Sequence, residues 1–318
     1  MLHRLQNILG QDIIHLSYLG GSVTEGFPYS EYIKQAYPDI LSEILVENAP
    51  TKTFHSHNYA KCGEKSSHAL LTSDILLSGH DNHIIFLEYA LTDDISKESV
   101  MIFESLVRKL ARRKEKPAIV VLILPARKEL LIGKYMRDIC THYGIPCIDF
   151  PERLQQHIQN GLLLPDEYWL DETHPKQQGH HWIADQIFSM LTECMQKEPS
   201  AASPYRLTKK RFLASPYETI KTIKLDADIT YPLTMEFHCS VLWISYIQHE
   251  ESFMGNMQVF VDQELIYNLH GKSFYCWYYP VQLKLFEKKE SAMHSVTFQM
   301  APGEEKKKFI LEYVAYVE

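Results

Sequence analysis

The chain has 318 residues, of which 45% are hydrophobic and 23% are charged, and its formal net charge is -8 at pH 7. This length and composition are ordinary for a globular protein with a real core in two domains or one large one. There is no basic surplus to favour nucleic-acid binding, and no apolar stretch reaches the roughly 18 residues of a membrane span. We therefore expect neither a nucleic acid nor a membrane as a partner.

Five apolar runs alternate with longer amphipathic stretches over the first 200 residues. The runs predicted as strands are 12–20, 52–60, 83–90, 118–125 and 145–150. Apolar residues at helical spacing predict helices over 39–48, 66–78, 96–114 and 127–143, and a last helix from near Pro175 through 182–197. The run 118–125 is apolar on both faces, as in a buried parallel strand. The alternation predicts a parallel sheet covered by helices.

Small residues and two prolines at 198–207 break this pattern and predict a linker. The runs that follow are alternating, aromatic or β-branched, and no helical stretch separates them. They are 222–230, 233–248, 257–269, 275–286, 294–301 and 309–317. We therefore predict two domains, an α/β domain over 1–200 and an all-β sandwich or jelly-roll module over 206–318.

The N-terminal segment and the cysteines bear on the compartment. Residues 1–21 interrupt their apolar run with Gln, Asn and Asp, which is not typical of a signal peptide. The cysteines stand singly, without a Cys-x-x-Cys pair, at positions 62, 140, 147, 194, 239 and 276. This favours reduced, mostly buried thiols over a disulfide scaffold. Together these features predict a cytoplasmic protein.

The stretch Leu-Gly-Gly-Ser-Val-Thr-Glu-Gly at 19–26 ends the first predicted strand. Ligands of an open α/β sheet bind outside the carboxyl ends of its strands, so the Ser22 hydroxyl is expected to face that crevice. Gly20 and Gly21 permit a tight turn and a close approach of backbone N–H groups. Taken alone, the stretch is better explained as an ordinary Gly-Ser turn that caps a short helix.

A second stretch, Leu-Asp-Glu-Thr-His-Pro at 170–175, places Asp171 three residues before His174. This spacing lets the carboxylate orient the imidazole and leaves the other ring nitrogen to accept a proton from Ser22. Separately, Asp171 is also typical of a helix N-cap and His174 of a partly exposed loop histidine. The combination with Ser22 favours a Ser-His-Asp site.

Four blocks of the first 200 residues resemble the SGNH or GDSL hydrolase family. The first block, usually Gly-Asp-Ser, is similar to Gly21-Ser22 in a branch that begins Gly-Gly-Ser-x-Thr. The second is a glycine after the second strand, here Gly63. The third, often Glu-Phe-Ala-x-Asn-Asp, is similar to 88–94, and the last, Asp-x-x-His-Pro, is matched at 171–175.

This resemblance implies the flavodoxin-like three-layer parallel sheet of the SGNH hydrolase fold; the β module is matched only in general character. It also implies that Ser22 is the nucleophile, His174 the general base and Asp171 its orienting partner, without a cofactor. The backbone N–H groups of Ser22 and Gly63 are then two parts of the oxyanion hole.

The third part of that hole is normally an asparagine amide, and the residue at this place is Thr92. Three alternatives follow: Thr92 replaces the asparagine, another donor such as Asn58 replaces it, or the esterase is weakened or inactive. Asn58 is more typical of a turn residue that caps the end of a strand.

Other polar residues are interpreted structurally. His55 and His57 share a strand face without an acidic or Cys partner at ligand spacing, so no metal site is predicted. Glu88, in an apolar strand, is expected to be paired or hydrogen-bonded near the strand end. Most aromatic residues of the β module are assigned to its core, and only 274–280 is kept as a candidate carbohydrate or interdomain surface.

The resemblance thus implies a serine esterase that removes short acyl groups, foremost acetyl, from carbohydrate. Two alternatives stay open. One is an O-acyltransferase in surface-polysaccharide modification, and the other is a non-catalytic carbohydrate-binding or assembly protein of the same fold.

Overall fold

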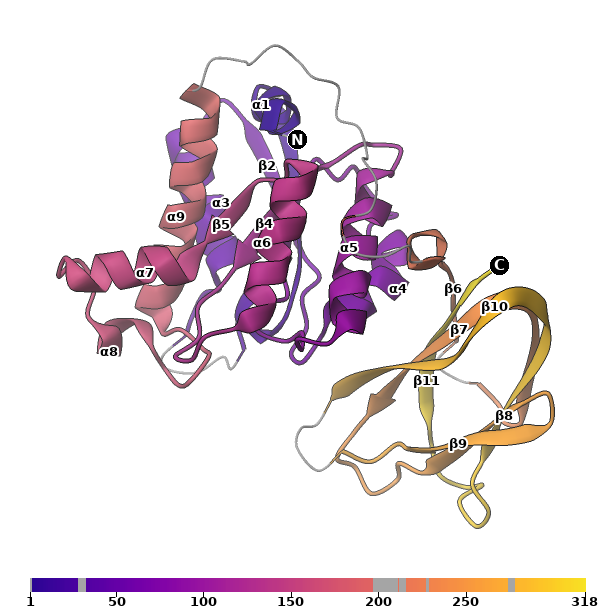
Figure 1. The fold of residues 1–318 in the computed structure, drawn as a ribbon. Coiled ribbons are helices and arrows are strands. Elements are labelled where there is room, and N and C mark those ends of the chain that lie inside the picture. The colour runs from indigo at the N-terminus through magenta and orange to yellow at the C-terminus, as the bar shows by residue number, and fades with distance from the viewer. Residues whose placement is uncertain (1, 28–32, 197–210, 212–215, 227–228, 274–277) are drawn as a thin grey trace. The chain divides into compact units, whose positions relative to one another are not determined.

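A computed structural model describes residues 2–27, 33–196, 211, 216–226, 229–273 and 278–318 (Figure 1). The chain divides into two compact units, one of residues 1–69 and 76–215 and one of residues 70–75 and 216–318. The predicted linker at 198–207 lies outside the described residues.

The first unit is built on a five-stranded parallel sheet with the order β2-β1-β3-β4-β5. Its strands are β1 (Ile13–Gly20), β2 (Thr53–Asn58), β3 (Ile84–Glu88), β4 (Ala118–Ile123) and β5 (Cys147–Asp149). The predicted parallel sheet is confirmed, with each strand somewhat shorter than its apolar run. The order is that of a flavodoxin-like sheet, whose topological switch point lies between β1 and β3. Chain segments that leave these two strands at their carboxyl ends therefore flank the crevice where ligands bind in such sheets.

Helices cover both faces of this sheet (Figure 1). They are α1 (Leu2–Leu9), α2 (Ser22–Glu25), α3 (Tyr37–Asn48), α4 (Ser66–Leu76), α5 (Lys97–Ala111), α6 (Leu131–Tyr143), α7 (Phe150–Gln159), α8 (Pro165–Tyr168) and α9 (Gln177–Gln196). The predicted helices are found, but α1, α7 and α8 were not expected. Each is short, and each buries some of its apolar residues against a core that no local pattern reveals.

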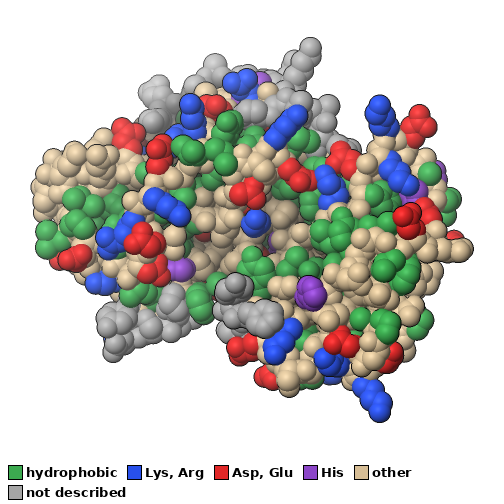
Figure 2. Space-filling model, turned by 60° about the horizontal axis from the view of Figure 1, so that its bottom comes forward, with side chains coloured by type: hydrophobic (Ala, Val, Ile, Leu, Met, Phe, Trp, Pro, Cys, Tyr) green, Lys and Arg blue, Asp and Glu red, His purple; other side chains and the backbone are tan. Residues whose placement is uncertain are grey.

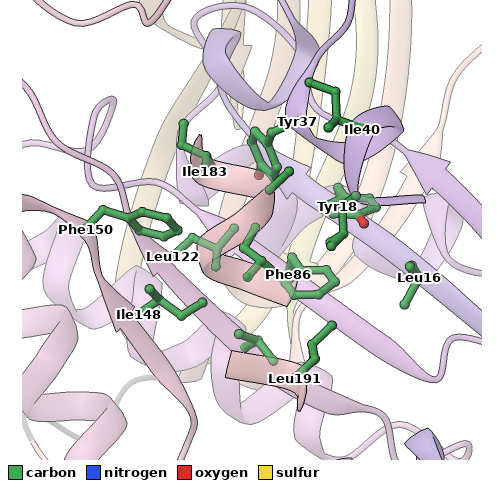
Figure 3. Close-up of a cluster of buried hydrophobic side chains, with 14 of the residues drawn as sticks. Leu16, Tyr18, Tyr37, Ile40, Phe86, Leu122, Ile148, Phe150, Ile183 and Leu191 are labelled. Atoms are coloured by element: carbon green, nitrogen blue, oxygen red, sulfur yellow. The ribbon is translucent and has the colours of Figure 1, made fainter. Parts of the chain in front are cut away.

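One hydrophobic core lies between the sheet and the helices α1, α3, α7 and α9 (Figure 3). Near the carboxyl end of β1, the Tyr18 ring stacks on Phe86 of β3 at 4.9 Å between ring centroids. The edge of Tyr37 from α3 meets Tyr18 at 6.1 Å. All three rings are buried, and such pairs add about 0.5–1.5 kcal/mol each beyond the area they bury. This packing fixes the start of α3 close to the end of β1.

The second unit contains one six-stranded antiparallel sheet with the order β6-β11-β7-β10-β8-β9. Its strands are β6 (Lys221–Lys224), β7 (Leu233–Gln248), β8 (Asn256–Val261), β9 (Glu264–His270), β10 (Tyr279–Met300) and β11 (Ile310–Val317), after the short helix η1 (Pro216–Thr219). The all-β prediction is confirmed. The prediction of two separate strands over 275–286 and 294–301 was wrong, because the single strand β10 extends from Tyr279 to Met300. Described residues form one sheet and not the two of a simple sandwich.

The long strands explain this difference. β10 pairs with β7 along most of its length, and the pairing register shifts between Glu287 and Ala292. Bulges of this kind bend a strand and increase its twist, and β7 and β10 curve in Figure 1. A curved sheet can enclose a core alone, and Phe237, Leu285 and Phe298 lie in that core.

The surface of the described residues carries both acidic and basic side chains (Figure 2). Lys and Arg side chains are interspersed with Asp and Glu on the face that Figure 2 presents. No helix in the described part of the chain is long and apolar enough to cross a membrane. The five described cysteines form no disulfide bond with one another; Cys140, Cys194 and Cys239 are buried, and position 276 lies outside the described residues.

Candidate active site

Ser22 is the first residue of α2, directly after the carboxyl end of β1, and it is partly exposed. The two glycines before it are required by close neighbours. A Cβ atom at Gly20 would lie 2.6 Å from Thr24 Oγ1, and one at Gly21 would lie 2.8 Å from Thr92 Cγ2. The turn can therefore form only without side chains at these positions, which places the Ser22 hydroxyl at the switch point of the sheet.

Ser22, His174 and Asp171 form a hydrogen-bonded chain. The distance from Ser22 Oγ to His174 Nε2 is 2.8 Å, and the distance from His174 Nδ1 to Asp171 Oδ2 is also 2.8 Å. The structure thus brings together three side chains from opposite ends of the α/β unit. With the Nδ1 proton directed at Asp171, Nε2 is left as the acceptor for the Ser22 hydroxyl.

A tight loop presents Asp171 and His174. It is closed by a backbone hydrogen bond from Leu170 N to His174 O at 2.9 Å, and residues 169 and 175 form an isolated β-bridge. Within the loop, Asp171 Oδ1 accepts hydrogen bonds from Thr173 N and His174 N, each at 2.8 Å. One carboxylate oxygen therefore holds the loop, and the other orients the imidazole.

The charge on Asp171 is favoured by these contacts. Partial burial raises the pKa of its carboxyl group, but hydrogen bonds from His174 N and Thr173 N and from the His174 ring outweigh this effect. The pKa of Asp171 is therefore below its ordinary value. The side chain is 48% exposed and that of His174 20%, so this pair lies at the surface of the unit.

Arg127, in the segment after β4, contacts the same loop and was missed by sequence reasoning. It follows β4; its backbone N–H donates to Glu172 O at 2.9 Å and its Nε to Asp171 O at 3.3 Å. Its guanidinium lies 5.7 Å from the centre of the Trp169 ring. A basic residue just beyond a buried strand, at the carboxyl edge of the sheet, was the available signal.

Gly63 lies in the turn between β2 and α4 with φ = 76°, a left-handed conformation that favours glycine. The turn is tied to the Ser22 segment: Lys61 N donates to Gly20 O at 3.2 Å, and Cys62 N donates to Glu25 Oε2 at 2.6 Å. Among the described residues, neither Ser22 N nor Gly63 N donates a hydrogen bond to a protein acceptor.

Thr92 lies beside the turn that carries Ser22, with its methyl group toward Gly21. Its hydroxyl is 3.5 Å from Tyr89 O, the limit of a hydrogen bond. Asn58 is engaged elsewhere: Nδ2 donates to Thr24 O at 2.7 Å, and Oδ1 accepts from Ala60 N at 3.1 Å. The interpretation of Asn58 as a turn residue is confirmed.

Two buried carboxyl groups lie behind the candidate site. Glu88 Oε2 accepts hydrogen bonds from Thr24 Oγ1 at 2.9 Å and Gly21 N at 3.3 Å, as expected of a hydrogen-bonded acid at the end of its strand. Asp93 Oδ1 accepts from Ser66 N at 2.9 Å, at the start of α4. Burial raises the pKa of Glu88 to about 8 and that of Asp93 to about 7.

Sequence reasoning also missed a cluster of histidines whose members come from β1, β2 and the loop before β3. Its rings lie 3.8 to 6.2 Å apart in neighbouring pairs and belong to His15, His55, His57, His80 and His83. His15 Nδ1 and His57 Nε2 are 3.4 Å apart, and Tyr59 OH is 2.7 Å from His80 Nε2. Within the described ranges, no three His, Cys, Asp or Glu side chains are arranged to hold a metal ion.

In the second unit, Trp243 is buried, as predicted for a core residue. Of the candidate surface stretch 274–280, residues 274–277 lie outside the described residues, whereas Tyr278 and Tyr279 are exposed.

Comparison with solved structures shows a shared fold over essentially the whole chain. A two-domain esterase (CEX) active on acetylated mannans has a TM-score of 0.84 at 17% identity, covering 100% of this chain and 96% of its own. The same type of esterase co-crystallised with mannopentaose has a TM-score of 0.81 at 18% identity, covering 100% and 95%. An acetyl xylan esterase, AlAXEase, has a TM-score of 0.47 at 17% identity, covering 56% and 99%.

At these identities the similarity shows the fold, an α/β unit with a parallel sheet joined to an antiparallel β unit. No protein-family model and no curated protein sequence matches the chain.

Proposed function

We propose that this protein is a serine ester hydrolase of the SGNH type that removes acetyl groups from carbohydrate. The observation that carries the proposal is the hydrogen-bonded chain from Ser22 Oγ through His174 to Asp171, with both distances 2.8 Å, at the switch point of the sheet. A serine hydroxyl is a weak nucleophile, and an imidazole oriented by a carboxylate is the arrangement that activates it.

The proposed reaction has two halves. Ser22 Oγ attacks the acetyl carbonyl carbon while its proton passes to His174 Nε2, and Asp171 stabilises the imidazolium that forms. The tetrahedral intermediate then collapses: the bond to the sugar oxygen breaks, that oxygen takes the proton from His174, and an acetyl-enzyme remains. Water repeats the sequence, giving its proton to His174, and acetate leaves as Ser22 recovers its hydrogen.

The negative charge that develops on the carbonyl oxygen in the tetrahedral intermediate must be stabilised by hydrogen-bond donors. We assign Ser22 N and Gly63 N, which have no protein acceptor among the described residues, and the Thr92 hydroxyl as the third. The Thr92 hydroxyl is poorly engaged with Tyr89 O at 3.5 Å, so rotation toward substrate costs little. A well-placed oxyanion donor can be worth on the order of 10²–10³ in turnover.

The substrate class is supported by the fold. The full-length similarity to a two-domain esterase active on acetylated mannans includes the antiparallel unit, and it favours an O-acetylated polysaccharide or oligosaccharide. Fold similarity alone is an analogy, so the substrate is part of the proposal. The chemistry requires no cofactor, and a cytoplasmic location stays a prediction.

The test is acetate release from acetylated mannan oligosaccharides, acetylated xylan and p-nitrophenyl acetate by the wild type and Ser22→Ala. Ser189→Ala, at an exposed serine of α9, is the matched control. We expect the wild type and Ser189→Ala to release acetate at equal rates, and a folded Ser22→Ala to lose at least a thousandfold in kcat.

Other outcomes separate the alternatives. Equal background rates for the wild type and Ser22→Ala on all three substrates would contradict hydrolysis and favour the non-catalytic binding role. Acetyl groups that appear on an added sugar acceptor, with little free acetate, would favour the O-acyltransferase.

A further inference from the structure

Glu88 lies directly behind the turn that carries Ser22. It is the last residue of β3, its side chain is buried, and its Oε2 accepts hydrogen bonds from Gly21 N at 3.3 Å and Thr24 Oγ1 at 2.9 Å. Gly21 precedes Ser22 and Thr24 follows it by two residues. One carboxyl oxygen therefore fastens both sides of the proposed nucleophile to the end of a central strand.

The hydrogen-bond network extends from Thr24 into α3. Thr24 Oγ1 is 2.9 Å from Tyr37 OH, and Tyr37 N donates to His180 Nδ1 at 3.2 Å. These groups are buried. Side-chain hydrogen bonds with Glu88 and Tyr37 therefore hold the Ser22 turn in addition to its backbone hydrogen bonds.

The surroundings of Glu88 oppose a negative charge. Desolvation raises its pKa to about 8, although hydrogen bonds from Thr24 and Gly21 lower it. Asp93, which follows β3, raises it further by repulsion. No Lys or Arg of the described residues forms an ion pair with it; the other titratable groups that interact with it are Tyr37 of α3, Tyr89 beyond β3 and Tyr168 of α8, whose pKa values burial also raises.

We propose that Glu88 in its uncharged form is a positioning residue for Ser22, and that its ionisation turns the enzyme off on the alkaline side. This inference rests on the proposed function and adds a means of regulation to the same site. A neutral carboxyl group holds the turn. A buried carboxylate, hydrogen-bonded to the backbone of Gly21 next to Ser22, instead repels the oxyanion that develops beside Ser22 N. Asp171 already stabilises the imidazolium, so a second negative charge has no catalytic use there.

The test is the pH profile of kcat/KM for p-nitrophenyl acetate between pH 6 and 9.5, with the rate of Ser22→Ala subtracted. If only the uncharged form is active and the pKa is about 8, wild-type kcat/KM falls about thirtyfold between neutral pH and pH 9.5. Glu88→Gln, which keeps the shape of the uncharged acid and cannot ionise, is expected to retain kcat/KM through pH 9.5.

Two further variants guard the interpretation. Asp93→Asn can still accept from Ser66 N and is the matched control, because burial also raises the pKa of Asp93, to about 7. It should keep the alkaline decrease, displaced to lower pH by the loss of repulsion. Thr24→Val removes a hydrogen bond that lowers the pKa of Glu88, so it should displace the decrease to higher pH even if Glu88→Gln fails to fold.

The outcomes distinguish this inference from the proposed function. An active wild type with the same alkaline decrease in folded Glu88→Gln, or an unmoved decrease in Thr24→Val, overturns the role of Glu88 alone. A decrease that disappears only in Asp93→Asn assigns it to Asp93 and also overturns the inference. A wild type no faster than Ser22→Ala at every pH overturns the proposed function itself.

Discussion

The pair Thr92→Val and Thr92→Asn tests the oxyanion hole most directly. Valine keeps the shape of threonine, including the methyl group that would lie 2.8 Å from a Cβ at Gly21, and removes only the hydroxyl. In the resting structure that hydroxyl makes one long contact, 3.5 Å to Tyr89 O, so its loss should barely change stability. Any large effect on turnover must then arise in the transition state.

The magnitude follows from the charge that Thr92 would meet. A hydrogen bond to a charged group is worth about 1.5–3 kcal/mol, and turning the hydroxyl away from Tyr89 O offsets less than about 1 kcal/mol of this because that bond is long. The net loss is therefore about 0.5–3 kcal/mol, which corresponds to roughly a 2- to 150-fold decrease in kcat. Asparagine supplies the usual amide donor, so Thr92→Asn should retain or exceed wild-type activity.

The assay is kcat and KM on p-nitrophenyl acetate and an acetylated oligosaccharide, with melting temperatures measured beside them. A donor that acts in the transition state lowers kcat with little change in KM. Thr92→Val within twofold of wild-type kcat would refute the assignment of Thr92 as a donor. Complete loss of activity in a folded Thr92→Asn would refute the alignment of Thr92 with the family's asparagine.

Two more predictions concern other parts of the α/β unit. Asp171→Asn should lower kcat on the order of a thousandfold, because an amide has no charge to stabilise the imidazolium and its NH₂ group favours the wrong tautomer of His174. A decrease below tenfold in single-turnover kinetics would remove Asp171 from the mechanism. Burial and neighbouring imidazoles lower the pKa values of His15 and His57 from their ordinary 6.5. Below about pH 6.5 the unfolded chain therefore takes up protons that the folded chain does not, so the free energy of unfolding decreases as the pH is lowered. In urea titrations at pH 7 and pH 5, the double variant His15→Gln/His57→Gln should lose less stability on acidification than the wild type. The control His238→Gln, at an exposed histidine of β7, should lose as much as the wild type. Equal losses in all three proteins would contradict the assignment of this acid sensitivity to His15 and His57.

Local chemistry was enough to predict the framework. The runs predicted all five strands of the parallel sheet, most clearly β3 and β4, which are buried along their whole length and must therefore be apolar on both faces. The spacing of Asp171 and His174 predicted their contact, since residues three apart in a tight loop meet without help from the rest of the chain. The Gly-Gly-Ser stretch predicted a turn at the end of β1, because glycine permits a tight turn.

Contacts between residues far apart in the sequence were decided by the tertiary structure. Ser22 and His174 are 152 residues apart, and only the folding of the strands and helices into one unit brings Nε2 to 2.8 Å from the hydroxyl. The same applies to Glu88 behind Gly21, to Arg127 on the Asp171 loop, and to the histidine cluster, whose members come from β1, β2 and the loop before β3. The sequence alone determined which short segments form strands, turns and local pairs, because those depend on neighbours along the chain. Which polar groups are buried together, and therefore which of them carry a shifted pKa or a catalytic role, depends on neighbours in space.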